Sequence, residues 1–173
     1  MKFGKIYIGL LAVIITSFAA NIEPQYLNVT KVVDGDTIYF KDNIKCRLAF
    51  IDTPESMKND KAKKDIRNCS GITLENLVDA GLKSKAYTGE FFKVGSSYKI
   101  YILGEDHYGR LVCYSEQFNK KIVEEGYALP FYEFIPESKK REYTAALNKS
   151  KINNSGLWKS HPSLMQCLNK SDD

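Results

Sequence analysis

Acidic and arginine side chains gather in three short segments of the sequence, residues 34–37 (DGDT), 47–55 (RLAFIDTPE) and 106–110 (DHYGR). The first and third are typical of tight turns, and Pro54 in the second prevents a strand ladder from simply continuing. Each segment alone is ordinary. Together they supply the side chains needed to hold a hard divalent cation against a phosphodiester. These are the carboxylates of Asp36, Asp52 and Glu55 and the guanidiniums of Arg47 and Arg110.

The order and wording of the segments, VxDGDT, RLAFIDTPE and DHYGR, resemble the staphylococcal nuclease (thermonuclease) family of calcium-dependent phosphodiesterases. The similarity extends from Tyr26 to Trp158. It implies that Asp36 and Asp52 provide carboxylate ligands to one Ca²⁺ and that Thr53 offers its backbone carbonyl. Calcium takes roughly six to eight oxygen ligands, so waters and a phosphate oxygen would complete the set.

The same resemblance implies roles for the remaining charged residues. Glu55 takes the position of the carboxylate that orients or deprotonates the attacking water, which is the task of a general base. Arg47 and Arg110 match the two arginines that bind the scissile phosphate, and planar guanidinium donors suit phosphate oxygens better than lysine does. Because every one of these positions carries the expected residue, we expect an enzyme rather than a binding module that has lost its catalytic side chains.

Two tyrosines, a histidine and one loop match the family less closely. Tyr108 and Tyr132 fall where the family places tyrosines against the nucleotide, and an aromatic platform suits single-stranded nucleic acid. Ordinary surface packing is the alternative for either ring. His107 stands where a lysine is usual. The connection after Glu55 is longer than the family pattern by about a dozen residues, and the sequence leaves the role of this insertion at 56–72 open.

Stretches rich in β-branched and aromatic residues predict five strands, at residues 26–33, 37–40, 44–51, 98–103 and 110–115. In the third stretch, period-two alternation places Cys46 toward the core and Arg47 away from it. The same alternation places Arg47 and Asp52 on opposite faces of the strand. Convergence of those two side chains therefore needs a strand end or a bulge near Ile51.

Helical spacing of apolar residues predicts helices within 73–93, 119–126 and 136–151. Gly81 and Gly89 allow the first to be one helix or two shorter ones. The charged run at 56–67 has two interpretations, a solvated loop or a phosphate-attracting loop. Five strands with about three helices predict an α+β, mainly β fold, a five-stranded Greek-key barrel of the OB type, which commonly binds nucleic acid or sugar on one face. The predicted apolar stripe of the first helix consists of Leu74, Leu77, Val78, Leu82 and Ala86.

Composition indicates one globular domain. The 173 residues are 43% hydrophobic and 27% charged, with a net charge of +4, which is ordinary usage and excludes wholesale disorder. Lys2 and Lys5 precede an uncharged stretch that ends in small residues, typical of a secretory signal peptide cleaved after Ala19. An uncleaved anchor or a buried helix is the alternative. We expect residues 1–19 to be removed, residues 20–173 to form a single nuclease domain, and the product to be exported, either secreted or periplasmic.

The predicted mature chain contains an even number of cysteines, which allows three pairings in an exported protein. Cys46 and Cys113 both fall on core-facing positions of predicted strands, which makes them a candidate pair, and free buried thiols are the alternative. No Cys-x-x-Cys occurs and neither histidine has a cysteine neighbour pattern, so we do not expect a zinc site. The four cysteines are Cys46, Cys69, Cys113 and Cys167.

The residues and the resemblance together predict an exported, calcium-dependent endonuclease. It would cut DNA and RNA by water attack at phosphorus, and the resemblance implies 3′-phosphate products. Nucleic acid is the expected partner, with no stable protein partner, no membrane association after signal cleavage, and a monomeric state. The alternatives are a non-catalytic OB-type nucleic-acid-binding module and a calcium-stabilised structural domain, and the latter leaves Arg47 and Arg110 unexplained.

Overall fold

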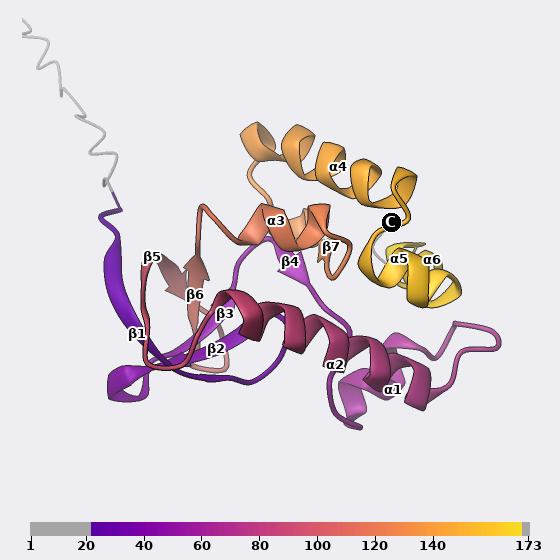
Figure 1. The fold of residues 1–173 in the computed structure, drawn as a ribbon, viewed down its shortest axis with the longest axis horizontal. Coiled ribbons are helices and arrows are strands. Elements are labelled where there is room, and N and C mark those ends of the chain that lie inside the picture. The colour runs from indigo at the N-terminus through magenta and orange to yellow at the C-terminus, as the bar shows by residue number, and fades with distance from the viewer. Residues whose placement is uncertain (1–21, 171–173) are drawn as a thin grey trace, which may run out of the picture.

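The computed structural model describes residues 22–170, and the predicted signal peptide lies outside them. Five strands close into a barrel in the order β1-β2-β3-β6-β5 (Figure 1). Neighbouring strands are antiparallel except β3 and β6, which run parallel. Closure leaves no free sheet edge in the barrel, and the predicted five-stranded barrel is confirmed. The strands are β1 (Gln25–Val32), β2 (Thr37–Phe40), β3 (Lys45–Leu48), β5 (Ser97–Glu105) and β6 (Leu111–Tyr114).

The third predicted strand is interrupted. After β3 ends at Leu48, Ala49 and Phe50 form a turn, and the chain continues as β4 (Ile51–Asp52). This short strand pairs with β7 (Leu129–Pro130) in a separate two-stranded sheet. The strand end that the sequence required near Ile51 is therefore present.

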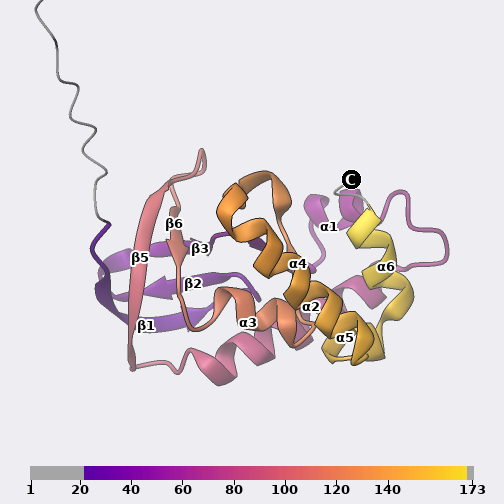
Figure 2. The same cartoon turned by 90° about the horizontal axis from the view of Figure 1, so that it is seen from above.

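The predicted helices are confirmed as α2 (Leu74–Phe91), α3 (Asn119–Glu124) and α4 (Glu137–Ile152), with α2 forming one continuous helix. Figure 1 and Figure 2 both place the barrel at one end of the molecule and α5 and α6 at the other. None of the helices described between residues 22 and 170 combines the length and apolarity that a membrane span requires. The helices that the sequence did not indicate are α1 (Asp60–Asp65), α5 (Gly156–Ser160) and α6 (Pro162–Lys170), with 3₁₀ turns η1 (Lys41–Asn43) and η2 (Tyr132–Phe134).

Helix α2 buries a face that shares only Leu77 with the predicted stripe. Thr73 caps its first turn through a reciprocal pair of hydrogen bonds with Asn76. Leu82, predicted to lie in the apolar stripe, is 50% exposed. The helix rests partly on loops rather than on large apolar side chains, so its contact face is made of small residues. The buried residues are Leu77, Ala80, Gly81, Ser84 and Thr88.

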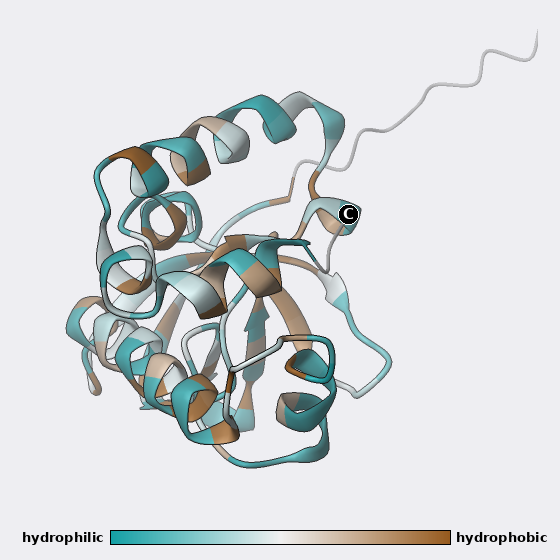
Figure 3. Ribbon diagram, turned by 90° about the vertical axis from the view of Figure 1, so that its right-hand side faces the viewer, coloured by the Kyte–Doolittle hydropathy of each residue, from teal (hydrophilic) through white to brown (hydrophobic). Residues whose placement is uncertain are grey.

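The core fills the barrel and the space beneath the helices. Hydrophilic and hydrophobic residues alternate along the helices (Figure 3), which lets each helix bury one face and expose the other. Phe92 and Phe118 are fully buried and lie with their ring centroids 4.9 Å apart, joining α2 to the start of α3. Trp158 is 6% exposed and packs in the same core.

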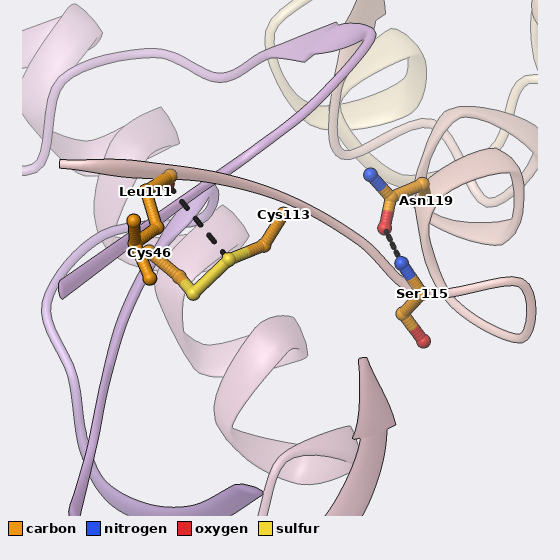
Figure 4. Close-up of a disulfide and its surroundings, with 5 residues drawn as sticks. All are labelled: Cys46, Leu111, Cys113, Ser115 and Asn119. Carbon is orange, nitrogen blue, oxygen red and sulfur yellow. Dashed lines mark hydrogen bonds between the residues drawn. A yellow bond between two sulfur atoms is a disulfide. The ribbon is translucent and has the colours of Figure 1, made fainter. Parts of the chain in front are cut away.

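Two disulfides are present. Cys46 on β3 is bonded to Cys113 on β6 across the parallel strand pair (Figure 4), which confirms the candidate pair. Cys69, in the connection between α1 and α2, is bonded to Cys167 on α6. The second disulfide therefore ties the insertion at 56–72 to the C-terminal helix.

Candidate active site

The turn between β3 and β4 places Asp52 beside Arg47. Phe50 has a φ of 68°, a left-handed conformation that a phenylalanine seldom adopts. Hydrogen bonds from distant parts of the chain hold this turn: the side-chain amide of Asn119 donates to the Ala49 carbonyl at 2.7 Å, and the Phe131 N–H donates to the Phe50 carbonyl at 2.9 Å. The strand direction therefore changes within two residues, and Asp52 returns toward the face that carries Arg47.

Arg47 joins two of the predicted acidic residues. Its Nη1 forms a close ion pair with Asp36 Oδ1, and its Nη2 lies 2.6 Å from Asp52 Oδ1 and donates to the Ile51 carbonyl at 3.3 Å. The backbone N–H and the hydroxyl of Thr53 donate to Asp36 Oδ2 at 3.0 and 2.8 Å. One guanidinium thus contacts both carboxylates, which brings Asp36 and Asp52 close to each other.

The electrostatics of this pair keep both partners charged. Burial opposes ionisation of Asp36, but the charge of Arg47 and the hydrogen bonds from Arg47 and Thr53 outweigh it and hold the pKa of Asp36 below its ordinary value. Burial likewise opposes the charge of Arg47, yet Asp36 and Asp52 together raise its pKa. The buried carboxylate of Asp36, 3% exposed, is therefore an anion.

Glu55 is held by the insertion that follows it. Its Oε1 lies 2.8 Å from Lys61 Nζ, and its Oε2 accepts a hydrogen bond from the Asn59 side-chain amide at 2.8 Å. Asn59 is also the N-cap of α1, since its Oδ1 accepts from the Ala62 N–H at 2.7 Å. The helix that this cap begins is the element that carries Lys61.

Lys61 links Glu55 to its acidic neighbours. Its Nζ lies 3.6 Å from Asp52 Oδ1 and 3.3 Å from Asp65 Oδ2. Burial opposes the ammonium charge, but the surrounding carboxylates raise the pKa of Lys61. Neither a solvated loop nor a phosphate-attracting loop describes the whole charged run at 56–67. Lys61 contacts the acidic residues of the site, whereas Lys63 is 65% exposed and pairs with Asp60.

Helix α2 supports both acidic loops through its small residues. A Cβ added at Gly81 would overlap the carbonyl oxygen of Glu55, and one added at Gly35 would lie 2.8 Å from Ser84 Cβ. Thr88 donates a hydrogen bond from its hydroxyl to the Gly35 carbonyl at 2.7 Å. The backbones on either side of the site therefore approach α2 more closely than larger residues would permit.

Arg110 lies on the same outer face of the barrel as Arg47 but is held by a different carboxylate. Arg47 pairs in register with Val112, so Arg110, two residues earlier on the neighbouring chain, shares its face. The Nε of Arg110 donates to Asp106 Oδ2 at 2.8 Å, and the Arg110 N–H donates to Asp106 Oδ1 at 2.9 Å. Burial opposes the charge of Asp106, but the hydrogen bonds from Arg110 and from the Tyr108 N–H lower its pKa.

The two predicted tyrosines lie in different surroundings. Tyr108 is 73% exposed, and the Arg110 guanidinium lies 5.5 Å from its ring centroid. His107 packs against the same ring, with 3.8 Å between ring centroids. Tyr132 is on η2, and its hydroxyl lies 3.1 Å from Thr144 Oγ1 on α4. Tyr108 is thus placed beside an arginine, whereas Tyr132 is tied to α4.

The oxygen atoms of two carboxylates, those of Asp36 and Asp52, are suitable ligands for a hard cation. Within residues 22–170, no group of three or more His, Cys, Asp or Glu side chains could by itself hold a metal ion. Asp36 and Asp52 nevertheless surround one cationic group, and hard carboxylate oxygens are the donors that calcium prefers. Burial raises the pKa of Asp34 and of Asp65, and the nearby carboxylates, including Glu55, raise both further. This excess of negative charge favours a bound cation.

Several residues that build the site were not singled out from the sequence. Asn119 begins a predicted helix and Asn59 lies in the charged run at 56–67, and no pattern distinguishes either from a surface asparagine. In the sequence Gly81 indicates only a weakened helix, whereas in the structure it allows a close approach of the Glu55 backbone. The available signal was positional: Asn59 precedes a helix-forming run and is a good N-cap residue.

The fold and the site define an OB-type barrel protein with an acidic centre bridged by arginine. Residues 45–160 match the staphylococcal nuclease homologue family, and this match covers more than half of the chain. The chain therefore belongs to that family of nucleases.

Two relatives differ in how much of their length this chain covers. The uncharacterized protein MJ1439 of Methanocaldococcus jannaschii is 31% identical over 159 residues, which are 83% of this chain and 76% of the relative. Endonuclease YhcR of Bacillus subtilis is 29% identical over 152 residues, which are 80% of this chain but 12% of that protein. This chain thus corresponds to a small part of the endonuclease.

Proposed function

We propose that this protein is a calcium-dependent endonuclease that hydrolyses phosphodiester bonds of DNA and RNA by water attack at phosphorus, leaving 3′-phosphate ends. The observation that carries the proposal is the placement of Asp36 and Asp52 on one guanidinium, that of Arg47, with Glu55 joined to Asp52 through Lys61. Membership of a nuclease family and similarity to a protein named as an endonuclease support the same reaction class.

The metal would be held by Asp36, Asp52 and the backbone carbonyl of Thr53. When bound, a single Ca²⁺ supplies positive charge that stabilises the pentacovalent phosphorus and acidifies water. The protein contributes a buried carboxylate that stays ionised, because Arg47 and Thr53 stabilise the charged form of Asp36. A preformed anion requires no proton release when the cation binds.

The two arginines would bind the scissile phosphate from one face of the barrel. Arg47 uses Nη1 for Asp36 and Nη2 for both Asp52 and the Ile51 carbonyl, which leaves the second N–H of Nη1 and the N–H of Nε for phosphate oxygens. Arg110 is oriented by Asp106 through Nε, and its terminal nitrogens form no ion pair with a carboxylate of residues 22–170. Tyr108, exposed beside Arg110, would contact the nucleotide, and Tyr132 is a second candidate for this contact.

Glu55 would act as the general base. The contacts from Lys61 and Asn59 restrict its carboxylate to one orientation, and a carboxylate fixed in this way can accept a proton from a water at hydrogen-bond distance. The overlap that a Cβ at Gly81 would produce shows that the Glu55 backbone is also fixed, against α2. Both ends of the residue are therefore positioned before substrate arrives.

Export of the protein is part of the proposal. The N-terminal segment has the composition of a signal peptide, and the two disulfides suit an oxidising compartment, either the periplasm or the extracellular space. We expect a monomer whose partner is its nucleic acid substrate, without a stable protein partner and without membrane association after signal cleavage.

The test is digestion of single-stranded DNA and of RNA by the mature protein with calcium or with EDTA. We expect cleavage with calcium and none with EDTA, and loss of turnover but retained binding in Glu55→Gln. The matched control is Glu137→Gln, whose carboxylate is 87% exposed and pairs with Lys140. Equal cleavage in EDTA would contradict the calcium requirement. Binding without cleavage under any condition would support the non-catalytic nucleic-acid-binding module instead.

A further inference from the structure

A row of alternating basic and aromatic side chains crosses the outer face of the barrel beside the site. Tyr39 on β2 pairs in register with Lys31 on β1 and with Lys45 on β3. On β2 and β3 the residues next to this row, Ile38 and Cys46, are fully buried, so alternation places Tyr39 and Lys45 on the outside. Lys31 and Lys45 are exposed, and Tyr39 is half-buried between them.

The charges of this row are not neutralised. No carboxylate of residues 22–170 forms an ion pair with Lys31 or Lys45, whereas Lys99 on β5 lies 3.5 Å from Glu116. The Lys45 ammonium instead lies 5.6 Å from the ring centroid of Tyr39. An aromatic ring positions a cation without cancelling its charge, so the lysine remains available to an anion.

The row is continuous with the proposed catalytic centre. Lys45 precedes Arg47 by two residues on the same strand face, a separation of about 6.6 Å along a strand. On the other side, Cys46 pairs with Leu111, so Arg110 flanks Lys45 on the neighbouring chain. Lys31, Lys45, Arg47 and Arg110 therefore face the same side of the barrel, and the row ends at Arg47, which contacts Asp36 and Asp52.

We propose that Lys31, Tyr39 and Lys45 form a second nucleic-acid contact, which binds the phosphate backbone of a single strand as it leaves the catalytic centre. This inference rests on the proposed function. Lys31 and Lys45 are exposed like charges on the two strands that flank β2, and a polyanion that bridges them relieves their repulsion. The two lysines bind successive phosphates, and Tyr39 provides an apolar surface for the sugar or base between them.

The test measures how binding of a single strand of about 16 nucleotides depends on salt, in EDTA so that cleavage does not interfere. Each phosphate contact of a single strand contributes about 0.7 to the slope of log affinity against log salt concentration. The double variant Lys31→Ala/Lys45→Ala is therefore expected to lower the magnitude of the slope by about 1.4. Tyr39→Ala is expected to weaken binding with little change in slope, because the ring carries no charge.

The control is Lys151→Ala/Lys159→Ala, which also removes two lysines. Lys151 forms a comparable cation–ring pair with Trp158, 5.0 Å from its centroid, but Trp158 and Lys159 lie on α5, at the end of the molecule opposite the barrel (Figure 1, Figure 2). We expect its slope to equal that of the wild type. An equal loss of slope in both double variants would overturn the proposal, since it would show a dependence on net charge alone.

A kinetic comparison separates this inference from the proposed function. In the presence of calcium, the ratio of kcat/KM for the long strand to that for a dinucleotide should fall by roughly tenfold in Lys31→Ala/Lys45→Ala, in line with the loss of two phosphate contacts. If neither substrate is cleaved by any form of the protein, the proposed function fails while the salt slope still decides the inference. The inference would be overturned if the salt slope of Lys31→Ala/Lys45→Ala equalled that of the wild type. It would also be overturned if the two lysines were required for binding to phosphatidylglycerol vesicles and not for binding to the single strand.

Discussion

At the scale of single residues, the two arginines differ in how they are held. Arg47 is half-buried between two carboxylates, whereas Arg110 is anchored through Nε by Asp106 at the edge of the barrel. A lysine at either position has one nitrogen, so it cannot both keep the anchoring contact and present separate donors to a phosphate. The geometry of the guanidinium, more than its charge, is therefore the property that the proposed reaction requires.

Replacement of Arg110 by lysine tests this distinction. We expect Arg110→Lys to lower kcat/KM by roughly 10²-fold, because Nζ either stays with Asp106 or moves to the phosphate. Steady-state kinetics on single-stranded DNA provide the measurement, and Lys120→Arg on the exposed side of α3 is the control. A loss of only a few fold would show that positive charge alone is sufficient at this position.

The limits of prediction are clearest at Arg47 and Asp52. Strand alternation correctly places Arg47 outside the core and Cys46 within it. The meeting of Arg47 with Asp52, however, depends on the turn at Phe50, where the sequence Ala49-Phe50 contains neither Gly nor Pro to signal a break. The bonds that hold this turn come from Asn119 and from Phe131. Local pattern cannot reveal a conformation that contacts about 70 residues away impose.

At the scale of elements, α2 is predictable as a helix but not in its orientation. Its apolar spacing indicates the correct span, yet Leu82 is exposed and the buried face contains Gly81 and Ser84. Hydrophobic periodicity assumes that a helix packs through large apolar side chains. Here the contact surface is the backbone of two loops, so small side chains form the buried face. The positions of the large apolar residues therefore do not identify that face.

The glycines of α2 offer a matched test of this packing. We expect Gly81→Ala to destabilise the protein by about 1–3 kcal/mol and to reduce activity, because the new Cβ displaces the Glu55 backbone. Gly89→Ala in the same helix meets no atom within 4 Å and should stabilise the protein by about 0.5–1 kcal/mol. Urea unfolding measures both changes. Similar effects of the two substitutions would show that α2 does not support Glu55.

The insertion at 56–72 is the element whose structure the sequence left undecided. It forms α1 and then reaches Cys69, which is bonded to Cys167 on α6. The cysteine count allowed three pairings, and spacing alone could not select among them. Strand alternation predicts the core-facing pair Cys46–Cys113. It gives no information on Cys69–Cys167, because this disulfide joins a loop to α6, a helix that the sequence does not indicate.

Removal of the second disulfide has a predictable effect on stability. The bond closes a loop of 98 residues, so Cys69→Ser/Cys167→Ser should lower the free energy of unfolding by about 2–5 kcal/mol. Urea unfolding of the oxidised proteins provides the measurement. Under reducing conditions, where the wild type also loses its disulfides, the difference should disappear. A difference that persisted in reductant would assign the effect to the serine side chains instead.

At the scale of the whole molecule, His161 connects the C-terminal helices to α2. Its Nε2 lies 3.0 Å from Asp79, and its side chain is 10% exposed. Burial and the charge of Lys83 lower the pKa of His161 below its ordinary value of 6.5, although Asp79 opposes this shift. The folded protein therefore binds this proton less tightly than the unfolded chain does. The contribution of the neutral His161 side chain to the stability of the fold is complete above pH 6.5. It is lost as the pH falls from 6.5 through the lower pKa that His161 has in the folded protein.

His161→Gln isolates this contribution. We expect the free energy of unfolding of the wild type to decrease, relative to that of the variant, between about pH 7.5 and about pH 5.5. Comparison of the two proteins at each pH cancels the titration of the carboxylates, which is common to both. A difference between them that does not change with pH would show that His161 does not link protonation to folding.

The two disulfides overlap along the chain, since the span from Cys46 to Cys113 and the span from Cys69 to Cys167 share the residues between 69 and 113. A single proteolytic cut anywhere from residue 46 to residue 167 therefore leaves its two fragments covalently joined. Arg47, Glu55 and Arg110 all lie inside that interval. Nicked molecules would migrate as one species without reductant and would retain the connected polypeptide needed to close the barrel again after a cut.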